Sequence, residues 1–149
     1  MEIKFTKDQF KKLLKIVYLG NWLANAIHSG RKGDERIKEF DEIEQYIFSF
    51  AKDFGLERYV EFDEKFQEFF PTSELEEELQ KFVDEYDNEV FWEELIFRLT
   101  RRDFIREYGK EAINKMSLEE RIEKEFPFEE KYREEFSKNG IENLEIKET

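Results

Sequence analysis

The chain has 149 residues, an ordinary length for one domain, and it carries a formal net charge of −13. It contains no cysteine, which excludes disulfides, thiolate nucleophiles and cysteine-ligated metals. Although 42% of the residues are charged, 17% are aromatic, so the composition indicates a folded chain with an aromatic core.

Residues typical of helix starts and helix ends divide the first half of the chain into predicted helices. Thr6 with Gln9 has the form of a capping box and opens a predicted helix that runs to about Ser29, before Gly30. A second helix is expected from Asp34 to Phe54, before Gly55. Residues 56–70 are less regular, and we expect one or two helical turns from position 63, ending before position 71.

The second half offers further helix boundaries. Ser73 and Ser117 each begin a capping-box pattern, and the chain is expected to start a new helix at position 87 or 88 and end it before Gly109. The helix after Ser117 should be short, because the residue before Pro127 is pushed out of the helical region. A last helix should then run to Gly140. The tail, residues 141–149, is expected to dock or fray.

These elements predict an all-α fold: a single-domain irregular bundle of about five to six helices, with a Phe-rich core, over residues 1–149. No hairpin dipeptide or sustained alternation predicts more than a short two-stranded piece. The first helix and the helix from position 88 are apolar on two sides, so we expect them to be the central pair. The predicted core consists of Leu14, Val17, Leu23, Ile43, Ile47, Phe50, Phe54, Leu79, Phe82, Leu95, Leu99 and Phe104.

A polar group continues the apolar face of the first helix. Asn21, Asn25 and His28 lie on one side of that helix, and His28 is the only histidine of the chain. Such side chains could line a small-molecule cleft in which the histidine acts as a base of near-neutral pKa. The alternative is that this face simply reaches solvent where the helix ends.

Three arginines follow one another at helical spacing. Arg98, Arg102 and Arg106 lie at i, i+4 and i+8, where like charges repel and acidic partners are needed. We expect at least two of them to pair with carboxylates of other helices. The alternative is a site for a phosphate or another anion, which arginine binds with two parallel hydrogen bonds.

Helical carboxylate pairs raise the question of a magnesium site. The pairs are Glu39 with Glu42, Asp84 with Asp87, and Glu119-Glu120-x-x-Glu123. The last is similar to half of the motif of all-α nucleotide pyrophosphatases of the MazG and dUTPase type, whose second, downstream ExxD helix is missing here. With 38 acidic residues such pairs arise by chance, so we predict no family, metal or cofactor.

The uneven charge is the main functional signal. Residues 1–33 carry +5, residues 34–95 carry −16 and residues 96–149 carry −2. This argues against binding to nucleic-acid backbone or membranes and favours a non-catalytic interaction or regulatory module, whose acidic surface of residues 34–95 binds a basic partner. The alternative is a magnesium-dependent phosphohydrolase or nucleotide-binding enzyme. Without a signal peptide or a long apolar run, a cytoplasmic location is expected.

Overall fold

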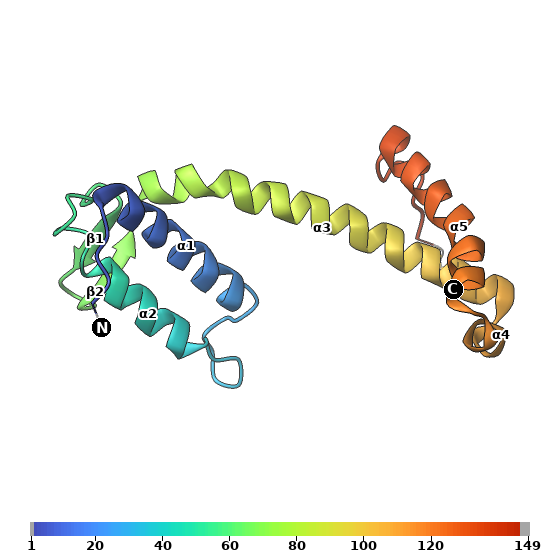
Figure 1. Ribbon diagram of the computed structural model, residues 1–149, viewed down its shortest axis with the longest axis horizontal. Coiled ribbons are helices and arrows are strands. Elements are labelled where there is room, and N and C mark those ends of the chain that lie inside the picture. The colour runs from blue at the N-terminus through green and yellow to red at the C-terminus, as the bar shows by residue number, and fades with distance from the viewer. Residues whose placement is uncertain (1, 147–149) are drawn as a thin grey trace. The chain divides into compact units, whose positions relative to one another are not determined.

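The computed structural model describes residues 2–146, and over this range the protein is mainly helical, with five helices and one small hairpin (Figure 1). The mainly helical class and the number of helices predicted from the sequence are confirmed. Residues 147–149 of the predicted tail lie outside the described residues. The elements are α1 Lys7–Asn25, α2 Lys38–Phe48, β1 Val60–Asp63, β2 Glu68–Pro71, α3 Ser73–Tyr108, α4 Lys110–Lys115 and α5 Leu118–Asn139.

Contacts along the chain separate two compact units. The N-terminal unit is Met1–Val83 and the C-terminal unit is Asp84–Thr149. Helix α3 is continuous over 36 residues, so it contributes residues to both units. The single domain expected over residues 1–149 stays a prediction.

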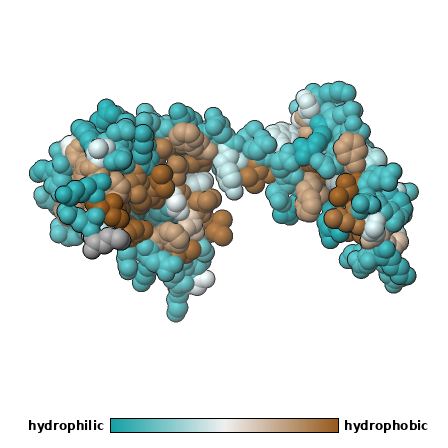
Figure 2. All heavy atoms as spheres, in the orientation of Figure 1, coloured by the Kyte–Doolittle hydropathy of each residue, from teal (hydrophilic) through white to brown (hydrophobic). Residues whose placement is uncertain are grey.

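The N-terminal unit is built on the packing of α1 against α2. The Thr6 capping box is present: its side chain accepts from the Gln9 backbone, and the Gln9 side chain accepts from the Thr6 backbone. The rings of Phe10 and Phe54 stack with centroids 4.0 Å apart. Figure 2 shows apolar side chains gathered over this unit. Its buried core consists of Phe10, Leu14, Phe48, Ala51, Leu56, Tyr59, Val60, Leu75 and Leu79.

The hairpin β1–β2 occupies the segment where helical turns were expected, which corrects that prediction. The strands pair antiparallel, with Val60 opposite Pro71 and Asp63 opposite Glu68. The Asp63 carboxylate accepts from the backbone N–H groups of residues 65 and 66, and Gln67 takes the positive φ of 56°. The side chain of Gln45 on α2 donates to and accepts from the Phe69 backbone, at 2.8 and 2.7 Å. The turn therefore forms without a glycine, and α2 supplies the edge partner.

The C-terminal unit is held by the later part of α3 against α5. Its buried cluster contains Ile96, Tyr132 and Phe136, with Trp92, Leu95 and Leu99 packed around it. The Phe104 side chain is buried and contacts the Phe128 ring edge-on at 6.0 Å. Phe10, Phe48, Phe104 and Phe136 are all buried, so the expected phenylalanine-rich core is confirmed.

Two expected helix breaks are absent. The Asn88 side chain accepts from the Trp92 indole N–H, at 3.3 Å, instead of capping a new helix, and α3 runs through this position. Pro127 lies inside α5, where Glu123 is the residue whose carbonyl loses its helical partner. Glu123 and Pro127 are both exposed, so water can satisfy that carbonyl. This exposure explains why the proline does not end the helix.

Several helix ends differ from the prediction by a few residues. Helix α1 ends at Asn25 rather than near Ser29, and α2 spans positions 38–48 rather than 34–54. Helix α4 was not predicted. The ends before Gly109 and Gly140 are confirmed, and both glycines have positive φ.

The predicted core is correct in part. Leu14, Leu79 and Phe104 are buried, whereas Leu23, Ile43 and Phe82 are exposed, the first by 57%. The second apolar side of α1 is also largely exposed, with Ile16 66% exposed. The expectation of a helix covered on both sides is therefore wrong for α1, because the N-terminal unit provides neighbours on one side of it only.

None of the described helices is long and apolar enough to cross a membrane. Helices α1, α3 and α5 have 19, 36 and 22 residues, which is sufficient length for a span. Charged residues recur within every turn or two of α3 and α5, and the first nine residues of α1 carry five of them, which a lipid-spanning segment excludes.

Candidate functional site

The polar group predicted on the first helix is part of a buried network. Asn21 and Asn25 are both buried, and the Asn25 amide donates to the Asn21 carbonyl oxygen at 2.7 Å. The Asn21 amide in turn donates to Asp41 on α2, at 3.1 Å. The side-chain carbonyl oxygen of Asn25 accepts from the Ile37 backbone N–H at 2.7 Å. These bonds tie α1 to the start of α2, and they use the polar atoms that a ligand would need.

His28 is separated from this pair. It lies in the loop after α1, where its Nδ1 is 3.0 Å from the Asp34 carboxylate. The Ser29 backbone N–H donates to the same carboxylate, and these two partners, Ser29 first, lower the pKa of Asp34 to about 2. The three predicted residues therefore do not converge on one cleft: two asparagines hold the helices, and the histidine holds a loop.

Glu44 is the acidic residue in this region whose protonation is most altered. Burial raises the pKa of the Glu44 carboxyl to about 7, and the nearby Asp41 raises it further, against the lowering effects of Asn21 and Arg36. Arg36 is itself bound to Asp41, with its Nη2 2.7 Å from a carboxylate oxygen. Among the described residues no cation forms an ion pair with Glu44, so its carboxyl takes up a proton near neutral pH.

The arginine row finds its partners on its own helix. Arg98 pairs with Glu94 at 3.0 Å, whereas Arg102 and Arg106 lie 2.8 and 3.5 Å from the same Asp103 carboxylate oxygen. The expectation of carboxylates from other helices is therefore wrong. It fails because α3 places an acidic residue beside or one turn away from each arginine.

Asp103 and Tyr132 are the residues of this region that the sequence analysis missed. The Tyr132 hydroxyl on α5 donates to Asp103, and the Arg102 guanidinium donates to Tyr132 at 3.0 Å. The Arg102 hydrogen bond, followed by that of Tyr132, lowers the pKa of Asp103 to about 2, against the opposing effect of burial. This triad joins α3 to α5 within the C-terminal unit and occupies Arg102 with structural contacts.

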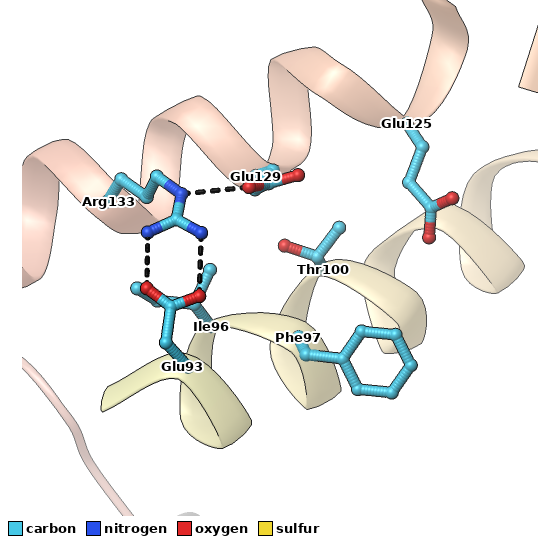
Figure 3. A pocket seen from close by; sticks show the side chains of 7 residues that line it. All are labelled: Glu93, Ile96, Phe97, Thr100, Glu125, Glu129 and Arg133. Carbon is cyan, nitrogen blue, oxygen red and sulfur yellow. Dashed lines mark hydrogen bonds and ion pairs between the residues drawn. The ribbon is translucent and has the colours of Figure 1, made fainter. Parts of the chain in front are cut away.

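A separate cleft lies between α3 and α5 in the C-terminal unit, with a volume of about 230 Å³ (Figure 3). Ile96, Phe97 and Thr100 of α3 line it together with acidic and basic groups of both helices. Its remaining lining residues are Glu93, Glu125, Glu129 and Arg133. This volume is below the range of about 300–1,000 Å³ common for drug-sized ligands, so it suits one side chain or a small ion.

Ion pairs fill one end of the cleft. Arg133 holds both oxygens of Glu93, at 2.6 and 2.7 Å, and one oxygen of Glu129 at 2.8 Å. These contacts raise the pKa of Arg133, and the Arg133 hydrogen bond lowers the pKa of Glu93. At the other end, Glu125 has a more distant cation: Arg121 Nε lies 3.7 Å from it. Figure 3 shows Glu125 apart from the Arg133 group, with Thr100 between them.

Thr100 has an unusual position in this cleft. Its side chain is buried, with 3% of the residue exposed, and its hydroxyl oxygen has no hydrogen-bond partner within the described part of the chain. A helical threonine ordinarily bonds the carbonyl four residues earlier, and a buried polar group without a partner is uncommon. In Figure 3 the hydroxyl faces the space between the two helices. The Thr100 hydroxyl, which can both donate and accept a hydrogen bond, thus does neither in the described chain.

The carboxylate pairs predicted from the sequence do not assemble a metal site. Within residues 2–146 no group of three or more histidine, aspartate or glutamate side chains is placed to hold a metal ion. Glu39 and Glu42 are both exposed on α2, as are Glu119, Glu120 and Glu123 on α5. The pairs share a helix face, as predicted, but α2 and α5 bring no further carboxylates to them.

Sequence patterns held little information on the cleft. Thr100 follows Ile96 by four residues, so the two lie on the same side of their helix, and that position is the available signal. Glu125, Glu129 and Arg133 are spaced by four residues but lie across the proline at which the helix was expected to end. The alignment of the two helices could not be read from either segment alone.

Comparisons with known proteins give this chain no relatives. No protein-family model matches it, and no curated protein and no solved structure matches it significantly.

Proposed function

We propose that the protein is a non-catalytic interaction module whose acidic surface, within residues 34–95, binds a basic protein partner. The observation that carries this proposal is the composition of α3 between positions 73 and 94, which holds ten acidic residues and one lysine. Nine of the ten acidic side chains are exposed. A surface of this density attracts cations and cationic segments over the distance of a Debye length, about 8 Å in physiological salt.

The acidic residues of α3 differ in how far they are already neutralised. Glu78 interacts with Lys15 and lies 3.8 Å from Lys11, so part of the basic N-terminal segment covers it. Within the described chain, Glu85, Asp87 and Glu89 have no ion pair and remain exposed. Exposed apolar side chains, Tyr86 and Phe91, lie among them. Uncompensated charge beside apolar surface is a combination suited to a basic, amphipathic protein segment.

The test uses a fluorescent oligolysine peptide and two charge-matched triple variants. Changing Glu85→Gln, Asp87→Asn and Glu89→Gln together should weaken binding several-fold, and added salt should weaken it further. The control triple, Glu123→Gln, Glu130→Gln and Glu142→Gln, removes the same charge from exposed positions outside residues 34–95 and should bind as the wild type does. Salt-independent binding, or equal loss in both triples, would contradict the proposal.

The proposal includes a cytoplasmic location and no chemical reaction. The alternative, a magnesium-dependent phosphohydrolase, requires four carboxylates that converge within a few ångströms. No observation favours it, because the carboxylate pairs of the described chain stay separate. The arginine row, its proposed phosphate clamp, is occupied by Glu94 and Asp103.

A further inference from the structure

We propose that the cleft between α3 and α5 binds a single arginine side chain of the basic partner, with Thr100, Glu125 and Glu129 as its hydrogen-bond acceptors. The inference rests on the proposed function and names the partner group that this site recognises. It is carried by the buried, unpartnered Thr100 hydroxyl together with the charge of the cleft.

The charge balance of the cleft favours a cation. Three carboxylates and one guanidinium line it, and Arg133 uses both oxygens of Glu93 but one oxygen of Glu129. Even when Arg121 is counted, 3.7 Å from Glu125, the carboxylates remain in excess. An incoming cation would therefore find negative charge that the protein does not neutralise, in a partly enclosed space where ion pairs are stronger than in bulk water.

Thr100 supplies the second, independent reason for a ligand. Its hydroxyl is buried and has no hydrogen-bond partner among residues 2–146, so its bonding capacity is unused in the protein by itself. A ligand N–H group directed at this oxygen would satisfy it. Because carboxylates surround the same space, a ligand rich in N–H donors fits better than an acceptor such as phosphate.

The shape and lining favour arginine over lysine. A guanidinium has five N–H donors in one plane, so it can serve a hydroxyl and two carboxylates at once. Phe97, with 54% of its surface exposed, is one of the lining residues, and an aromatic ring stacks more readily with the weakly hydrated guanidinium than with an ammonium group. Ile96 supplies the apolar surface for the methylene stem.

The experiment compares three peptides that differ at one position. Each is a short oligolysine with arginine, lysine or citrulline at its centre; citrulline is nearly isosteric with arginine but uncharged. Fluorescence anisotropy should give the order arginine, lysine, citrulline, with the arginine peptide binding about tenfold more tightly than the citrulline peptide, as for a charge-assisted hydrogen-bonded contact. Equal affinities for arginine and citrulline would overturn the proposal.

Two variants of the cleft test the same contact from the protein side. Thr100→Val removes the hydroxyl at nearly constant shape, and Glu125→Gln removes one charge from a partly exposed position that should not affect folding. Each should reduce the arginine preference several-fold. Glu123→Gln, exposed on α5 and absent from the cleft lining, should leave it unchanged.

The outcomes separate this inference from the proposed function. A wild type that binds all three peptides equally, with salt dependence, contradicts the arginine site and leaves the acidic interaction module standing. A wild type that binds none of them contradicts both. An arginine preference that survives Thr100→Val and Glu125→Gln together places the arginine elsewhere and overturns the cleft as its site.

Discussion

The two units of the protein each bury polar side chains, but they treat them differently. In the N-terminal unit, Asn21 and Asn25 bond each other, Asp41 and the Ile37 backbone, so their polar atoms are used within the fold. In the C-terminal unit, Thr100 is equally buried and its hydroxyl has no partner. The first arrangement stabilises a helix connection, and the second leaves bonding capacity for a ligand.

This comparison shows that burial of a polar residue does not by itself indicate a function. The asparagines were the more attractive candidates in the sequence, because they continue a core face toward the only histidine. In the structure their hydrogen bonds join α1 to the start of α2. Thr100, which no sequence motif marked, is the buried residue whose hydroxyl lacks a hydrogen-bond partner among residues 2–146.

Core truncation in each unit should have the largest effect. Phe48→Ala in the N-terminal unit and Phe104→Ala in the C-terminal unit each remove a fully buried ring, at a cost of about 3–5 kcal/mol. If the chain is one cooperative domain, as its sequence predicts, chemical denaturation of each variant should follow a single transition shifted to lower denaturant. Two transitions, one of them unshifted in each variant, would show that the units unfold independently.

Loss of the asparagine network should cause the second-largest decrease in the free energy of unfolding. Asn25→Ala leaves the Ile37 N–H and the Asn21 carbonyl oxygen without partners, so we expect the free energy of unfolding to fall by roughly 2–3 kcal/mol. Asn114→Ala, at an exposed position on α4, is the matched control and should change it by less than about 0.5 kcal/mol. Peptide binding should be unaffected by Asn25→Ala. A binding defect in a folded variant would make the network functional after all.

The triad of Arg102, Asp103 and Tyr132 should make a smaller, pH-dependent contribution to the free energy of unfolding. The pKa of Asp103 is about 2 in the folded protein against 3.8 ordinarily, and its side chain is 18% exposed. Its contribution, about 1–2 kcal/mol after allowance for solvent screening, is present above pH ~4 and is lost as the pH falls through ~4 toward ~2. Asp103→Asn should remove this dependence, whereas Asp53→Asn, at an exposed position, should not. An unchanged acid profile in Asp103→Asn would contradict the assignment.

Glu44 should act in the opposite direction and more weakly. Its pKa is raised to about 7 in the folded state from 4.5, so the folded protein retains the proton more strongly than the unfolded chain. Stability should therefore fall as the pH rises from ~4.5 to ~7 and then level off. Glu44→Gln should stabilise the protein at pH 8 by about 1 kcal/mol, because the side chain is partly exposed and the shift is discounted for screening. Glu42→Gln, exposed on the same helix, should show no such gain.

Periodicity and capping predicted much of the fold, and their failures have identifiable causes. Thr6 and Ser117 cap helices as their sequence patterns indicate, and Gly109 and Gly140 follow helix ends. The hairpin escaped prediction because Asp63 and Gln45 stabilise it through side-chain bonds, one local and one from another helix. The proline in α5 misled because its tolerance depends on which carbonyl faces water, a property of the folded helix.

The candidate site was much less accessible from the sequence. Arg102 was singled out, but its partners Asp103 and Tyr132 are a neighbour in sequence and a residue of another helix. The cleft requires that α3 and α5 align so that Thr100 and Glu125 line the same space. Helix periodicity gives the face of each helix but not which faces meet. The helices themselves could thus be predicted from the sequence, whereas the contacts between helices could not.

An NMR titration of the threonine and isoleucine methyl groups with N-acetyl-arginine amide can detect binding at the cleft itself. The citrulline analogue is the control. If the cleft binds a guanidinium, the signals of Thr100 and Ile96 should shift with the arginine ligand and saturate, while those of Thr6 and Thr72 in the N-terminal unit stay in place. The citrulline analogue should cause little change. Equal shifts with both ligands, or shifts confined to Thr6 and Thr72, would contradict the account.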